Sequence, residues 1–119
     1  MKEFTTYLNK AIDIAQKKEQ ELITTDRKDE ANLQKIRANI YGICRTIFEV
    51  VSKTKNGEEL REEYANKLDN LPKNWVESYE RAKQHNDVTK ILVEETKMEA
   101  LCEVKEKFEE LWRKQVGEC

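Results

Sequence analysis

The sequence LQKIRANIYGICRTIFEVV, from Leu33 to Val51, carries the strongest helical signal in the chain. Its apolar residues recur at steps of three and four, which is the spacing of one face of an α-helix. A main stripe comprises Leu33, Ile36, Ile40, Ile43, Ile47 and Val50. A second stripe beside it comprises Tyr41, Cys44, Phe48 and Val51. Together the stripes predict a central helix from about Arg27 to Lys55 with a wide apolar face.

Three further segments show the same helical period. They predict a helix from about Lys2 to Thr24, an arm from Glu58 to about His85, and a helix from Asp87 to about Val116. Three glycines and one proline in 119 residues leave little chain for irregular structure. The third arm contains Pro72, which lacks a backbone donor, so we expect a break or a kink there.

Four arms of similar length with short connections favour one fold class. We predict an all-α, up-down-up-down four-helix bundle whose third arm is broken or kinked at Pro72. A three-helix bundle with short accessory helices is the alternative. We expect residues 1–119 to form a single helical-bundle domain, because domains commonly have this length.

Side chains near the predicted helix ends indicate how each helix begins and stops. We predict Asp26 as the N-cap of the central helix and Gly57 as the left-handed residue that ends it. Asn74 and Glu77 resemble a capping box that restarts the third arm after Pro72. The predicted buried residues of the last helix are Val88, Ile91, Leu92, Met98, Leu101, Val104, Phe108, Leu111 and Trp112.

The charge pattern disfavours nucleic acid and membranes as partners. The 22 basic and 24 acidic residues alternate along the chain, which is typical of a solvated helix surface. Nucleic-acid binding needs basic residues clustered on one face. No apolar run approaches the ~18–20 residues of a membrane span, and the first residues lack the apolar core of a signal peptide. We therefore expect a soluble, cytoplasmic protein.

The sequence carries no motif for a cofactor, a metal ion or catalysis. Cys44, Cys102 and Cys119 are widely spaced, so they form neither a disulfide framework nor a zinc pattern. The first two are predicted to be small core residues. His85 is the only histidine and cannot supply the two Glu-x-x-His motifs of a di-metal bundle. No Ser/His/Asp arrangement or glycine-rich phosphate loop is present, so we expect no enzymatic activity.

Glu95 falls at a position where the last helix expects an apolar residue. A solvated glutamate is the favoured interpretation, and a buried Glu95 paired with Arg37 or Arg45 is the alternative. The neighbouring Glu94 and Glu95 are both predicted to be solvated, because adjacent helical residues do not face each other. Because Glu95 is the clearest polar residue at a position expected to be apolar, the first alternative function is an enzyme or a cofactor-binding bundle with a site around Glu95.

The second stripe of the central helix is the candidate interface, with Tyr41, Phe48 and Val51 as its residues. If one bundle cannot cover both stripes, a second chain would cover the remaining one, and aromatic side chains are common interface anchors. We therefore expect a small, non-enzymatic protein-interaction, adaptor or regulatory module, with a homodimer as one form. A weak nucleic-acid-binding regulator is the second alternative and requires the scattered basic pairs to converge.

Overall fold

The computed structural model describes residues 2–115 and 117, which form an all-α bundle. The helices are α1 (Lys2–Thr24), α2 (Lys28–Thr54), α3 (Gly57–Asn70), α4 (Val76–Gln84) and α5 (Val88–Gln115). A short 3-10 helix, η1 (Leu71–Asn74), joins α3 to α4. The prediction of an all-α bundle is confirmed. The predicted helix end at Val116 and the third cysteine, Cys119, lie outside the described residues.

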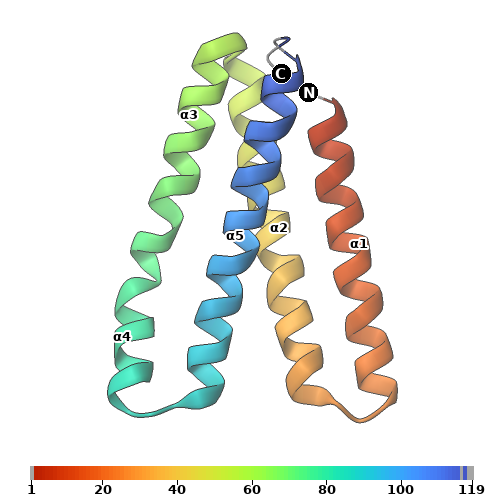
Figure 1. Ribbon diagram of the computed structural model, residues 1–119, viewed down its shortest axis with the longest axis vertical. Coiled ribbons are helices and arrows are strands. Elements are labelled where there is room, and N and C mark those ends of the chain that lie inside the picture. The colour runs from red at the N-terminus through yellow and green to blue at the C-terminus, as the bar shows by residue number, and fades with distance from the viewer. Residues whose placement is uncertain (1, 116, 118–119) are drawn as a thin grey trace.

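The arms lie side by side and the chain reverses direction between them (Figure 1). It passes down α1, returns along α2, descends through α3 and α4 as one interrupted arm, and returns along α5. The first and last described residues therefore lie at the same end of the molecule. None of these helices holds an apolar stretch of the length needed to cross a bilayer.

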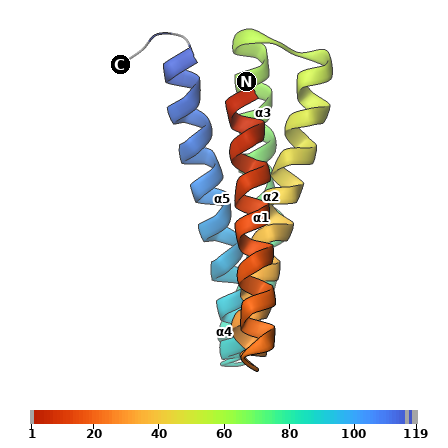
Figure 2. The same cartoon turned by 90° about the vertical axis from the view of Figure 1, so that its right-hand side faces the viewer.

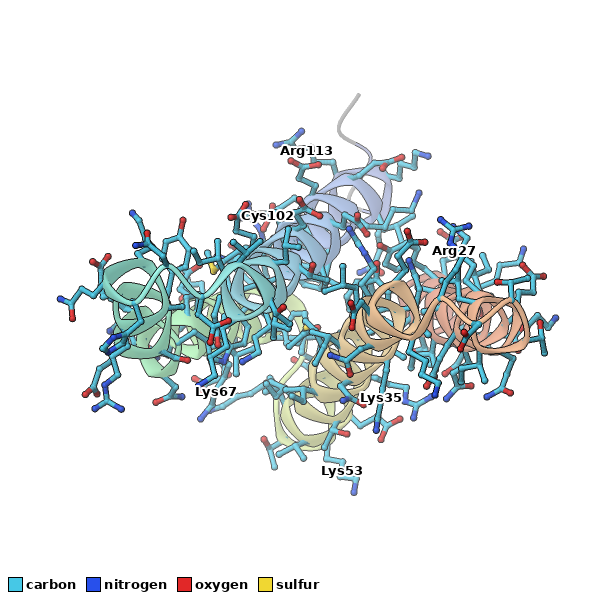
Figure 3. The ribbon with its side chains drawn as sticks, turned by 90° about the horizontal axis from the view of Figure 1, so that it is seen from below. Arg27, Lys35, Lys53, Lys67, Cys102 and Arg113 are labelled. Carbon is cyan, nitrogen blue, oxygen red and sulfur yellow. The ribbon has the colours of Figure 1, made fainter. Side chains whose placement is uncertain are left out.

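The two ends of the bundle differ in how closely the arms approach one another. At the closed end, formed by residues 2–15, 38–70 and 100–112, all the arms converge (Figure 1). Figure 2 shows α1 there in front of α3, with α5 on one side and α2 on the other. At the open end, residues 16–37 and 75–99 form two hairpins that separate, and they occupy opposite sides when viewed from below (Figure 3).

Aromatic side chains fill the core of the closed end. All four arms contribute rings, among them Phe4, Phe48, Tyr64 and Phe108, and Trp112 stacks on Phe108. The Tyr64 and Phe108 centroids are 4.9 Å apart and those of Phe4 and Phe48 are 5.0 Å apart, in the edge-to-face geometry that aromatic pairs prefer. The Tyr64 hydroxyl donates a 2.9 Å hydrogen bond to the carbonyl oxygen of Cys44, so this buried polar group is satisfied.

The open end has no comparable core. The residues buried within its two hairpins are Ala31, Ala82, Glu94 and Thr96. The predicted burial of Val88, Leu92 and Met98 is wrong, since these side chains are exposed. The cause is the separation of the hairpins, which leaves the first half of α5 packed mainly against α4. Burial is correct for the closed-end residues Leu101, Val104, Phe108, Leu111 and Trp112, and Ile91 is half-buried.

The helix ends confirm two sequence predictions and contradict two. The break at Pro72 is confirmed as η1. The left-handed conformation of Gly57 is confirmed by its φ of +57°, but Gly57 begins α3, and α2 ends at the extended C-cap Lys55. Asp26 does not cap α2, because its own φ is +60° and it closes the last turn of α1. The capping box at Asn74 and Glu77 is also wrong. No side chain caps α4, since the backbone stays helical through η1 and its N-cap, Trp75.

The two described cysteines lie in different environments. Cys44 is fully buried at the closed end, as predicted, and burial raises its pKa to about 12. Cys102 was predicted to adjoin the core and is instead exposed. Helical geometry explains the difference, because the neighbouring Leu101 already faces the core and the next residue points about 100° away from it.

Candidate functional site

The predicted interface residues lie inside the protein. Tyr41, Phe48 and Val51 are only 5%, 5% and 4% exposed and belong to the closed-end core. The expectation that a second chain covers them is therefore corrected, because the other arms of the same chain already do so. The main stripe of α2 is the more exposed one, with Ile43 at 42% and Val50 at 59%.

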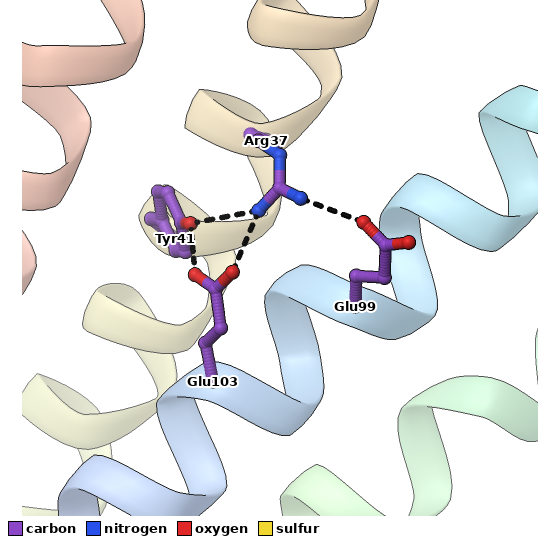
Figure 4. Close-up of polar contacts among 4 residues, drawn as sticks. All are labelled: Arg37, Tyr41, Glu99 and Glu103. Carbon is purple, nitrogen blue, oxygen red and sulfur yellow. Dashed lines mark hydrogen bonds and ion pairs between the residues drawn. The ribbon is translucent and has the colours of Figure 1, made fainter.

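A polar cluster links the two hairpins where they begin to separate (Figure 4). Arg37 donates from Nη2 to Glu99 Oε2 at 2.7 Å and from Nη1 to Glu103 Oε1 at 3.0 Å. The Tyr41 hydroxyl donates to Glu103 Oε2 at 2.6 Å. Burial, and then the bond to Glu103, raises the pKa of Tyr41 to about 12. This cluster joins α2 to α5 at the boundary between the closed and the open end.

In the described part of the chain, Arg37 and Arg45 bond to residues other than Glu95. Arg37 pairs with Glu99 and Glu103, while Arg45 donates to Asn9 Oδ1 at 2.8 Å. Glu95 is exposed, as the favoured interpretation predicted. The alternative of a buried Glu95 paired with either arginine is therefore wrong.

The buried glutamate of α5 is Glu94, whose side chain is only 7% exposed. Its Oε1 accepts hydrogen bonds from Ser78 Oγ at 3.0 Å and from Lys97 Nζ at 3.1 Å. Its Oε2 is buried and has no hydrogen-bond partner among the described residues. The prediction that Glu94 is solvated is wrong because α4 packs against α5 and brings Ser78 onto this carboxylate.

An apolar groove lies beside Glu94, between η1 and α4 on one side and α5 on the other. It has a volume of about 390 Å³. We call it the α4–α5 groove, and its apolar lining consists of Pro72, Trp75, Val76, Tyr79 and Met98. Val76 and Met98 are 57% and 41% exposed, so apolar surface faces solvent there. The acidic residues Glu94, Glu95 and Glu99 complete its lining.

Two other hollows on the molecule have a different chemistry. The first, of about 520 Å³, lies between α1, α2 and α5, where Lys10, Lys18, Arg37 and Glu103 contribute charged groups. The second, of about 660 Å³, is an open depression on α1 and α2 that includes Gly42 and Ile43. The α4–α5 groove differs from both in combining an aromatic floor with a buried carboxylate.

The geometry offers no clear centre for metal binding. Among the residues that the structure describes, no three His, Cys, Asp or Glu side chains are grouped to hold a metal ion. Ser78 and Lys97 both donate to the same oxygen of Glu94, so neither is positioned to activate the other. The groove instead combines an apolar floor with a buried carboxylate oxygen, Glu94 Oε2, that has no hydrogen-bond partner among the described residues.

The sequence contained a signal for this groove that the helical period concealed. Met98 was predicted to be buried because it keeps the register of the last helix. However, Glu94-Glu95-Thr96 interrupts the apolar pattern of α5 for a full turn. This polar turn belongs to the part of α5 that lines the groove, through Glu94 and Glu95.

Comparisons with protein-family models, curated proteins and solved structures find no match to this chain. The functional evidence is therefore the geometry and chemistry of the α4–α5 groove and its surroundings.

Proposed function

We propose that this protein is a non-enzymatic interaction module that binds an α-helix of a partner protein in the α4–α5 groove. The observation that carries the proposal is the exposed apolar lining, with Val76 and Met98 facing solvent beside Trp75 and Tyr79. Exposed apolar surface gathered in one hollow marks interaction sites, whereas single exposed apolar residues are ordinary.

A helix suits this groove better than an extended peptide. The walls are themselves helical, and the groove runs between α4 and α5, so a third helix packs by the same ridge-and-groove geometry. An extended peptide gains affinity from an exposed sheet edge, and the described chain has no strand to offer one. The flexible Met98 and the flat ring of Trp75 adapt to the apolar face of an entering helix.

Tryptophan fluorescence provides a direct test. The chain has two tryptophans, of which Trp112 is buried in the closed-end core and Trp75 lines the groove. In a Trp112→Phe background, Trp75 alone reports on the groove. We expect a blue shift and saturable binding in the micromolar range when an 18-residue amphipathic helical peptide is added, with leucines on its apolar face.

The exposed valines supply a matched control. Val76 lies in the groove and is 57% exposed, while Val50 lies on α2 and is 59% exposed. We expect Val76→Glu to weaken peptide binding at least tenfold and Val50→Glu to leave it unchanged. If no amphipathic helix binds, or if both substitutions weaken binding equally, the proposed function is wrong.

A further inference from the structure

We propose that the partner helix is basic, and that one of its lysine or arginine side chains bonds to Glu94 Oε2 within the α4–α5 groove. This inference rests on the proposed function and names the chemistry of the partner. It begins from the one carboxylate in the groove that is almost completely removed from solvent.

The hydrogen bonding of Glu94 is incomplete. Ser78 and Lys97 both bond to Oε1, while Oε2 is buried without a donor among the described residues. Buried polar atoms in folded proteins are nearly always hydrogen-bonded, and an unpaired charged oxygen is especially costly. Glu94 also lines the groove, so a donor on a bound helix reaches Oε2 once the side chains that cover this atom move aside.

The charges around the groove favour a cation as that donor. Its lining includes three carboxylates, those of Glu94, Glu95 and Glu99. The cations that contact this set are Lys97, bonded to Glu94, and Arg37, bonded to Glu99. Glu95 has no ion pair among the described residues. Lys83 also lies over the Tyr79 ring of the groove, so the uncompensated negative charge is that of Glu95, which a lysine or arginine of the partner compensates.

The aromatic floor also accepts cations. Lys97 Nζ lies 5.6 Å from the centroid of the Trp75 ring, and Lys83 Nζ lies 4.9 Å from that of Tyr79. Both distances are within the range of cation–π attraction. An entering side chain can thus lay its aliphatic stem on the apolar floor while its charged end reaches Glu94.

Three peptides of identical apolar face test the inference. Their polar faces carry lysine, glutamine or glutamate, and each is titrated against the full chain in the Trp112→Phe background. We expect the lysine peptide to bind at least tenfold more tightly than the glutamine peptide, and the glutamate peptide to show no binding. Because the charge is varied on the peptide, this comparison does not depend on the folding of a Glu94 variant.

A pair of substitutions then locates the preference. Glu94→Gln and Glu106→Gln each remove one negative charge from α5, but Glu106 is exposed and lies outside the groove. We expect Glu94→Gln to reduce the preference for lysine over glutamine to less than threefold, and Glu106→Gln to leave it near tenfold. Equal effects of the two substitutions would assign the preference to general acidity and overturn the inference.

The remaining outcomes separate this inference from the proposed function. If the lysine and glutamine peptides bind equally well and Val76→Glu abolishes both, the groove binds helices but the cation does not contribute. If no peptide binds, both proposals fail together. If sedimentation shows a dimer that Val76→Glu converts to a monomer, a second copy of the chain occupies the groove, and the basic partner is excluded.

Discussion

The closed end and the open end are built from the same four arms, yet they bury different kinds of side chain. The closed end interlocks aromatic rings such as Phe4 and Phe108, with Tyr64 hydrogen-bonded to the Cys44 carbonyl. The residues buried at the open end are two alanines, a threonine and a glutamate. One end therefore supplies the stability that holds the chain folded. The other leaves part of the apolar surface of the α4–α5 groove exposed to solvent.

This contrast explains why the groove can stay exposed without unfolding the protein. Most of the stabilising free energy of a small domain comes from buried apolar area, and here that area is concentrated in the closed end. The Arg37–Glu99–Glu103 cluster marks the boundary between the two regions.

The largest expected effect comes from a pair of substitutions on α5 that straddles this boundary. Leu101 is fully buried at the closed end and Met98, one turn earlier, is 41% exposed at the open end. We expect Leu101→Ala to lower the free energy of unfolding by about 3 kcal/mol, since a cavity is left behind, and Met98→Ala by less than about 1 kcal/mol.

Urea unfolding followed by circular dichroism measures both values. The two side chains are similar in volume, so a difference between the two losses of unfolding free energy reflects how deeply each side chain is buried. A loss for Met98→Ala as large as that for Leu101→Ala would contradict the division into two regions, because it would place a second core at the open end.

The fold of the closed end was predictable from sequence, and the spread of the open end was not. Apolar residues at helical spacing identify the helices, and the predicted buried face is correct for Leu101 to Trp112. On α2, however, the second stripe is buried and the main stripe, with Ile43 and Val50, is the more exposed one. The same spacing does not specify which arm covers that face. Val88 and Leu92 keep the register of a core helix, but the divergence of the hairpins leaves them exposed.

A second, smaller effect follows from the polar boundary between the two ends. The pKa of Tyr41 is about 12 in the folded chain and near 10 when unfolded. The raised pKa stabilises the folded chain in full below about pH 10. This stabilisation is lost as the pH rises through 12, because deprotonation of Tyr41 favours the unfolded chain. We expect the free energy of unfolding to fall by about 2 kcal/mol over this range. This is somewhat less than a shift of two pKa units corresponds to, because the neighbouring Glu103 is exposed and solvent screens its charge.

Tyr41→Phe isolates this contribution from other groups that titrate in alkali. The pKa values of Cys44 and Tyr64 are also raised by burial, and both groups remain in the variant. Unfolding free energies at pH 9, 10, 11 and 12 should therefore fall less steeply in Tyr41→Phe than in the unsubstituted chain. Identical slopes would show that the Tyr41 hydroxyl is not held in the boundary cluster.

The candidate site was only partly predictable for a related physical reason. The sequence identified the acidic interruption of α5, but it placed the exceptional residue at Glu95. On a helix, one position changes the direction of a side chain by about 100°, which separates an exposed glutamate from one buried against α4. Only the position of Ser78 on the facing helix decides that Glu94 is the buried member of the pair.

The smallest expected effect concerns Gly42, a helical glycine at the start of the closed-end part of α2. A Cβ atom added at this position meets nothing within 4 Å, so no neighbouring helix depends on the absence of a side chain. Gly42→Ala should therefore raise the free energy of unfolding by about 0.5–1 kcal/mol, because alanine loses less backbone entropy in a helix. It should leave peptide binding in the α4–α5 groove unchanged. Thermal unfolding at several protein concentrations tests this, and a concentration-dependent destabilisation would instead indicate that a second chain packs closely over Gly42.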